Sequence, residues 1–239
     1  MSDQMVFKRY EIKYMVTREQ KERILKQMQP YMRTDCHGRS TILSLYMDTP
    51  DFLLARRSME HPLYKEKLRM RSYGIAKPDA TVFLELKKKY DGVVYKRREC
   101  MTRQQLEACS SKHRMPKDTQ IMRELAFALN RYSDIRPAIL LSYEREAYYA
   151  REDHEFRITF DENVLWRDYD LNLYSGVYGE SIISPQLSIM EVKTAGAIPM
   201  WLVKVLSQEQ IYSSGFSKYG TAYTRRQTIE KNGGKYKYA

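Results

Sequence analysis

Charged and apolar residues alternate with a period of two in six segments of the chain. Side chains at positions i, i+2 and i+4 share one face of a β-strand, so each segment predicts a strand with one charged and one apolar face. The clearest example is residues 64–73, where Lys65, Lys67, Arg69 and Arg71 alternate with Leu68 and Met70. The same alternation occurs in residues 82–89, 94–98, 139–147, 154–161 and 187–194.

The charged faces of these strands are mainly basic, with an isolated acid on several of them. One such strand would be typical of a solvated surface. Six such strands are not explained by a solvated surface, because like charges that lie opposite each other on a sheet repel and need an anion to neutralise them. We therefore predict an α+β fold: a closed antiparallel β-barrel, or tunnel, of about eight strands with a polar basic lumen and helices packed outside.

Four amphipathic helices are expected to cover the apolar exterior of this barrel. They are predicted over residues 17–28, from Thr102, over residues 119–132 and from Pro199. The first two begin with a Thr followed three residues later by a Gln, which is a capping-box pattern. We expect residues 1–230 to form a single domain and residues 231–239 a flexible basic tail.

The chain has 239 residues and a formal net charge of +11. An excess of this size implies an anionic partner, which could be nucleic acid, an anionic membrane or a polyanionic small molecule. Nucleic acid is less favoured, because no DNA- or RNA-binding motif is present and the basic residues lie on alternating strand faces. No apolar run reaches the length of a membrane span and no signal peptide is visible, so we expect a cytoplasmic protein without a membrane span.

The cysteines and histidines show no metal-ligand spacing. Cys36, Cys100 and Cys109 form no CxxC pair and have no histidine cluster nearby, which predicts reduced thiols without a disulfide framework or zinc site. The four histidines, His37, His61, His113 and His154, are scattered and are predicted to be surface residues.

Nine short motifs follow one another in a fixed order from about residue 7 to residue 220. They are Arg-Tyr-Glu-Ile-Lys-Tyr (9–14), Ser-Leu-Tyr-Met-Asp-Thr (44–49), Lys-Leu-Arg-Met-Arg-Ser-Tyr-Gly (67–74), Phe-Leu-Glu-Leu-Lys-Lys (83–88), Arg-Pro (136–137), Ser-Tyr-Glu-Arg (142–145), Phe-Arg-Ile-Thr-Phe-Asp (156–161), Met-Glu-Val-Lys (190–193) and Phe-Ser-Lys (216–218). In this order the chain resembles the VTC domain (vacuolar transporter chaperone) of polyphosphate polymerases, within the triphosphate tunnel metalloenzyme or CYTH-like superfamily.

The resemblance implies a metal-dependent enzyme that transfers the terminal phosphate of ATP to a polyphosphate chain held in a basic tunnel. Arg binds phosphate through two parallel hydrogen bonds and Lys supplies a movable point charge. The implied substrate-binding residues are Lys13, Lys67, Arg69, Arg71, Lys87, Lys96, Arg98, Arg145, Arg157, Lys193, Ser217 and Lys218. Those implied to act in catalysis are Arg69, Arg71, Lys87, Arg145 and Glu191.

Carboxylates among these cations could hold Mn²⁺ or Mg²⁺, hard ions that prefer oxygen ligands. Glu191 matches the metal-binding glutamate of the family, and Glu11, Glu85 and Asp161 are the further candidates. Each of the four could instead form only an ion pair with a neighbouring Lys or Arg.

Two positions depart from the patterns of the relatives. The CYTH branch opens with Glu-x-Glu-x-Lys, whereas Arg9 replaces the first Glu here, which favours the VTC branch. Gly215 stands where better-known polymerases carry a basic residue before Phe-Ser-Lys. Two alternatives therefore stay open: an inorganic or nucleoside triphosphatase that uses the same tunnel, and a non-catalytic module that senses polyphosphate or nucleotide. The expected partners are ATP or another triphosphate and polyphosphate, and no oligomeric state is predicted.

Overall fold

Antiparallel strands form the body of the protein. The computed structural model describes residues 10–233 apart from 61, 92, 113–116, 133 and 154. Eight strands follow the order β1-β9-β7-β6-β2-β3-β4-β5, and the two-residue β8 (Glu180–Ser181) pairs with β7. Their bounds are β1 (Tyr10–Thr17), β2 (Met32–Asp48), β3 (Tyr64–Tyr73), β4 (Thr81–Tyr90), β5 (Val93–Thr102), β6 (Arg136–Ala150), β7 (Arg157–Arg167) and β9 (Leu187–Thr194).

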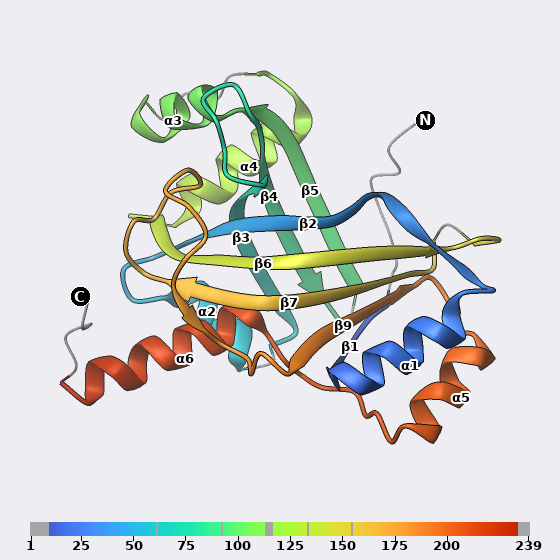
Figure 1. Cartoon of the computed structure of the whole chain (residues 1–239). Coiled ribbons are helices and arrows are strands. Elements are labelled where there is room, and N and C mark those ends of the chain that lie inside the picture. The colour runs from blue at the N-terminus through green and yellow to red at the C-terminus, as the bar shows by residue number, and fades with distance from the viewer. Residues whose placement is uncertain are drawn as a thin grey trace.

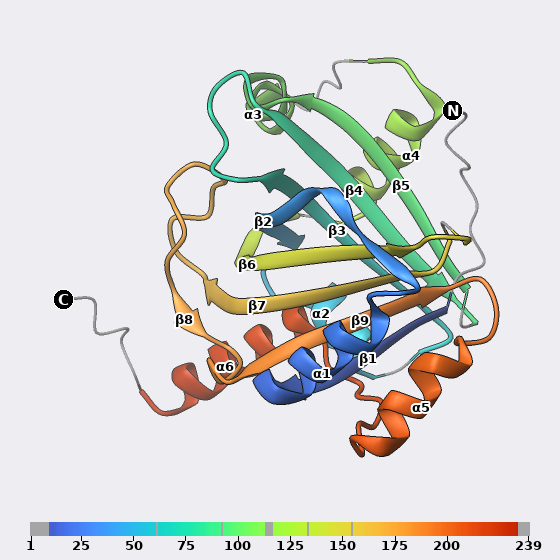
Figure 2. The same ribbon diagram turned by 45° about the vertical axis from the view of Figure 1, so that its right-hand side comes forward.

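The sheet is curled, as Figures 1 and 2 show, but it is not closed into a barrel, so the predicted closure is wrong. Strands β1 and β5 end the strand order, and no backbone pairing joins them among the described residues. A side-chain contact bridges the two halves instead: Lys87 Nζ on β4 donates to Glu11 Oε2 on β1 at 3.0 Å. Backbone closure would bring the cationic faces of β4 and β5 still closer to those of β1 and β9, and like charges oppose this.

The convex face of the sheet is apolar and covered by helices, as predicted. Near β3 and β4, Leu68 and Leu84 are buried in one hydrophobic cluster with Leu125 of α4 (Gln120–Arg131). Near β7 and β9, Ile158 and Val192 are buried in a second cluster with side chains of α1 (Arg18–Met28) and α5 (Met200–Gln208). Helices α1 and α5 lie side by side in Figure 1, whereas α3 (Arg103–Lys112) and α4 lie near β4 and β5.

Helix α6 (Lys218–Lys231) packs on the concave face, so the prediction that the helices lie outside is wrong for this one. Its Tyr219 ring stacks on the Tyr46 ring of β2 at 4.3 Å between centroids. Tyr46 belongs to the same strand face as Ser44, which bonds to a cavity arginine. The sequence pattern predicted neither α6 nor the short α2 (Leu53–Met59) that lies beside it. None of the helices described is both long and apolar enough to cross a lipid bilayer.

Local sequence signals explain the helix starts that were predicted. Thr17 and Gln20 form a reciprocal capping box before α1, and Thr102 and Gln105 exchange the same two hydrogen bonds before α3. Pro199 is the N-cap of α5 and not a residue of its first turn. Of the predicted tail, Lys231 still belongs to α6, and residues 234–239 lie outside the described part of the chain.

Candidate functional site

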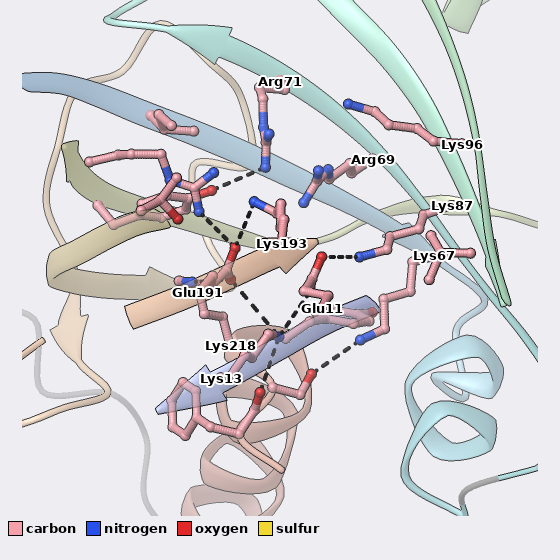
Figure 3. A pocket seen from close by; sticks show the side chains of 18 of the residues that line it. Glu11, Lys13, Lys67, Arg69, Arg71, Lys87, Lys96, Glu191, Lys193 and Lys218 are labelled. Atoms are coloured by element: carbon pink, nitrogen blue, oxygen red, sulfur yellow. Dashed lines mark hydrogen bonds and ion pairs between the residues drawn. The ribbon is translucent and has the colours of Figure 1, made fainter. Parts of the chain in front are cut away.

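The concave face of the sheet surrounds a cavity of about 2200 Å³. Its described lining contains thirteen Lys and Arg but four Asp and Glu. All twelve predicted substrate-binding residues line it, together with Glu11 and Glu191, whereas Glu85 and Asp161 lie beneath the lining. Figure 3 shows the labelled cations and carboxylates pointing toward one another from opposite strands. The alternating faces therefore meet in one place, as the sequence pattern indicated.

Glu85 is a buried counter-charge under the wall formed by β3, β4 and β5. It lies directly opposite Arg69 on β3 and Arg98 on β5. Its Oε2 accepts from Arg69 Nε at 2.7 Å, and its Oε1 lies 2.7 Å from Lys96 Nζ. Burial alone would raise the pKa of Glu85, but the charges of Arg69, Arg71 and Lys96 hold it well below its usual range. These contacts fix the directions of the cations around it.

Arg71 is held differently from Arg69. Its guanidinium donates to two neutral hydroxyls, Ser44 Oγ at 3.2 Å and Tyr143 Oη at 3.0 Å. The nearest Glu85 oxygen is 3.9 Å away. Its charge is thus oriented by partners that do not neutralise it, which leaves it available to an anion in the cavity.

Asp161 and Glu191 form a second anchor on β7 and β9. Arg145 donates to both oxygens of Asp161, at 2.5 and 2.6 Å, and to Glu191 at 3.3 Å. Lys218, at the start of α6, lies 2.5 Å from Asp161 and 3.2 Å from Glu191. Burial favours a raised pKa for Glu191, but Lys218, Lys193 and Arg145 lower it well below the usual value. Strand pairing and the helix start together build this cluster.

Lys67 connects the β3 wall to α6. Its Nζ contacts Ser217 Oγ at 3.1 Å, and the same oxygen accepts from Gly220 N as the N-cap of α6. Among the described residues Lys67 has no carboxylate within ion-pair distance. Burial lowers the pKa of Lys67 to about 8, and burial likewise lowers that of Lys96 to about 8.

Several cations lie directly opposite one another across the strands. Lys67 faces Lys87, Lys87 faces Lys96, and Arg157 faces Lys193. Directly opposed like charges lower the stability of a sheet, and an anion in the cavity would relieve their repulsion. Arg157 also pairs with Asp35 at 2.8 Å near the edge of the cavity.

Two of the four candidate metal ligands fit a hard divalent cation. Glu11 Oε1 and Glu191 Oε1 lie 3.7 and 4.0 Å from the same atom, Lys13 Nζ. Burial would raise the pKa of Glu11, but Lys87 and other cations lower it to about 2, so both carboxylates are ionised at neutral pH. Mg²⁺ is typically held by one or two carboxylates and the phosphates of the substrate. Glu85 and Asp161 fit less well, because they lie buried beneath the cavity lining, whereas Glu11 and Glu191 belong to it.

A sequence model of the VTC domain matches residues 8–225, which is nearly the whole chain. The chain belongs to the VTC domain family. A candidate adenylate cyclase from Bacillus halodurans has a similar structure, with a TM-score of 0.52 and 15% identity over 88% of this chain and 96% of that one. A candidate adenylate cyclase from Vibrio parahaemolyticus follows, with a TM-score of 0.46 and 14% identity over 89% and 95% of the two chains. No protein of curated function matches the chain.

This VTC domain therefore has a triphosphate-tunnel fold in an open, curled form. Several residues of its cavity were missed by the site prediction. Lys65 and Lys89 extend the basic lining, and Tyr46 and Tyr143 orient Arg69 and Arg71 through their hydroxyls. The signal for the two lysines was present, because they alternate with Lys67 and Lys87 on the same strand faces. The tyrosines became recognisable only once strand pairing was known.

Proposed function

We propose that this VTC domain binds the phosphates of ATP and of a polyphosphate chain in its basic cavity and transfers the terminal phosphate of ATP to the chain. The observation that carries the proposal is the mutual opposition of cavity cations, which an inserted polyanion would relieve. In the reaction, an end oxygen of the chain forms a bond to the γ-phosphorus while the bond to ADP breaks. Such a transfer needs positioning and charge neutralisation more than covalent help from the protein.

Arg71 and Lys67 are the residues best placed to bind phosphate. Arg71 is oriented by two hydroxyls, and Lys67 is held by Ser217. Lys67 makes no ion pair with a described carboxylate, and Arg71 makes only a long one, of 3.9 Å, with Glu85, so both can bind a phosphate oxygen. Arg69 and Arg145, fixed by Glu85 and Asp161, would define the walls along which the phosphates lie. In the proposal they stabilise the negative charge of the transferring group.

Glu11 and Glu191 would hold Mn²⁺ or Mg²⁺ together with the phosphates. A bound divalent ion would neutralise phosphate charge and polarise the transferring group. Because Lys13 now contacts both carboxylates, it would move from them toward a phosphate oxygen when the ion is present.

The size of the cavity favours a polymer over a single nucleotide. Small-molecule sites usually occupy about 300–1,000 Å³, whereas this cavity has about 2200 Å³. A triphosphatase remains the second candidate, because the same residues would serve if water were the acceptor.

Product analysis from ATP with Mn²⁺ tests the proposal and separates these reactions. We expect polyphosphate from the wild type, at least tenfold less from Arg71→Ala, and wild-type yield from Arg123→Ala, which removes an exposed arginine of α4. A loss of 1.5–3 kcal/mol, typical for one charge-assisted hydrogen bond, corresponds to about 10- to 150-fold. Glu191→Gln should cut turnover more than tripolyphosphate binding.

Other outcomes assign the cavity differently. Orthophosphate and ADP without any polyphosphate would identify a triphosphatase. Tight tripolyphosphate binding without any product would identify a sensing module. Full polymer formation in EDTA would contradict the metal requirement.

A further inference from the structure

A second group of potential ligands lies at the edge of the cavity. Asp35, Cys36 and His37 are consecutive, and one ligand atom of each lies within 4.8 Å of those of the other two. Cys36 and His37 are exposed, and Asp35 and His37 line the cavity. No other trio of His, Cys, Asp or Glu within the described ranges meets this spacing.

A β-bulge explains how three successive side chains can converge. Thr34 of β2 pairs with Tyr148 of β6, but the next pair is Arg39 with Glu146, so four residues of β2 are accommodated by one of β6. Gly38 in this segment has φ +55°. Consecutive side chains of a regular strand point to opposite faces, and the bulge removes that constraint. The sequence predicted no zinc site here, since Cys36 forms no CxxC pair and has no histidine cluster nearby.

The ligand types and one distance suit a soft or borderline cation. Cys36 Sγ lies 3.3 Å from Asp35 Oδ1. Ligands about 2.0–2.3 Å from a tetrahedral Zn²⁺ are about 3.3–3.8 Å apart, so these two atoms already have the required separation. A thiolate with an imidazole favours Zn²⁺ or Co²⁺ over Mg²⁺, which prefers oxygen alone.

We propose that Asp35, Cys36 and His37 form a three-ligand site for a Zn²⁺-class cation at the edge of the cavity, separate from Glu11 and Glu191. Three protein ligands leave a fourth position for water or another oxygen ligand. The thiol proton leaves when the metal–sulfur bond forms and passes to the buffer.

Arg157 couples this site to the cavity. Its guanidinium donates to Asp35 Oδ2 at 2.8 Å, while Asp35 Oδ1 faces the Cys36 thiol. A metal cation on Asp35 therefore competes with Arg157 for the same carboxylate and repels its charge. Removal of the Arg157 charge should strengthen metal binding, and metal binding should release Arg157 toward the cavity.

Co²⁺ alone, titrated into the reduced 239-residue chain, serves as a spectroscopic substitute for Zn²⁺. We expect a sulfur-to-cobalt charge-transfer band in the near ultraviolet for the wild type and for Cys100→Ser, which changes a second cysteine that is exposed and free in the described part of the chain. Cys36→Ser should lose the band, and both Cys36→Ser and His37→Ala should bind Co²⁺ at least about tenfold more weakly. Arg157→Gln should keep the band and bind about threefold more tightly.

A wild-type protein without the band, or a Cys36→Ser protein that keeps it, would overturn the site. Equal Co²⁺ affinity of Arg157→Gln and the wild type would overturn the coupling to Arg157. Neither readout depends on turnover, so both stand apart from the proposed phosphotransfer.

Discussion

Glu85 and Asp161 are almost inaccessible to solvent, yet each lies next to several cations of the cavity. Burying a charge costs several kcal/mol, and the attraction within a buried ion pair often no more than offsets this cost. The benefit of such pairs here lies in orientation. Arg69 and Arg145 each donate to a buried carboxylate, and these hydrogen bonds orient their remaining donors. At the scale of single residues, the cavity is organised by acids that a ligand does not touch.

Substitution of Glu85 tests this arrangement. We expect Glu85→Gln to lower the free energy of unfolding by about 3 kcal/mol, because neighbouring cations lose their buried counter-charge. Tripolyphosphate should raise the free energy of unfolding of this variant more than that of the wild type, since from the cavity it supplies the negative charge that these cations have lost. Urea unfolding with and without tripolyphosphate measures both effects. Glu107→Gln, on the exposed surface of α3, should change stability by less than about 0.5 kcal/mol, and an equal loss in the two variants would contradict the interpretation.

Lys67 makes binding depend on pH. Burial lowers its pKa to about 8, so its charge is present below pH 8 and is lost as the pH rises through that value. A bound phosphate favours the charged form and raises the pKa, so binding above pH 8 takes up a proton.

Calorimetry between pH 7 and pH 9 compares the wild type with Lys67→Arg, whose guanidinium stays charged. The affinity for tripolyphosphate should fall more steeply with pH in the wild type. Titration of the ligand itself affects both proteins equally. Parallel pH profiles would show that Lys67 does not contribute its charge to binding.

At the scale of elements, α6 links the stability of the fold to the site. Ser217 caps the helix through Gly220 N and also contacts Lys67. The next residue, Lys218, reaches both acids of the β7–β9 anchor. The first turn of one helix thus connects the two walls of the cavity.

Two substitutions of Ser217 separate these roles. Ser217→Ala should cost about 1 kcal/mol of stability through loss of the cap. Ser217→Asp should keep the cap, because Asp caps as well as Ser, but should weaken tripolyphosphate binding at least about tenfold by placing a negative charge among the phosphates. Thermal unfolding and calorimetry give the two quantities. An Asp variant that binds like the wild type would exclude this part of the cavity from the phosphate path.

The sequence predicted those strands and helices that are specified by residues close to one another in the chain. The alternation in residues 64–73 and 187–194 identified β3 and β9 with their bounds, and the cap at Thr17 identified the start of α1. Strand register is not local, so the positions of Arg69 and Arg98 opposite Glu85 could not be predicted. Helix α6 was missed because its buried stripe consists largely of Tyr219, Ala222 and Tyr223 amid polar residues. The bulge at residues 35–38 depends on pairing with β6 and was equally hidden.

At the scale of the whole molecule, the chain has a net charge of +11, and much of the excess positive charge lines the cavity on the concave face of the sheet. A curled sheet in which a side-chain contact links β1 to β4 can hold cationic faces near one another without pairing the backbones of its two edges. The cavity is larger than one nucleotide requires, and its cations are spread over β1, β3, β4, β5, β6, β7, β9 and the start of α6. This distribution suits a linear anion that contacts many of them at once.

The dependence of affinity on phosphate number tests whether the cavity binds a linear polyanion. Calorimetry at fixed pH and ionic strength would compare orthophosphate, pyrophosphate, tripolyphosphate and a longer polyphosphate. We predict that the dissociation constant falls by about tenfold or more from pyrophosphate to tripolyphosphate, as one further charge-assisted contact would give, and falls again for the longer chain. Equal affinity for orthophosphate and tripolyphosphate, or no binding of the longer chain, would contradict the account of a cavity built for a linear polyanion.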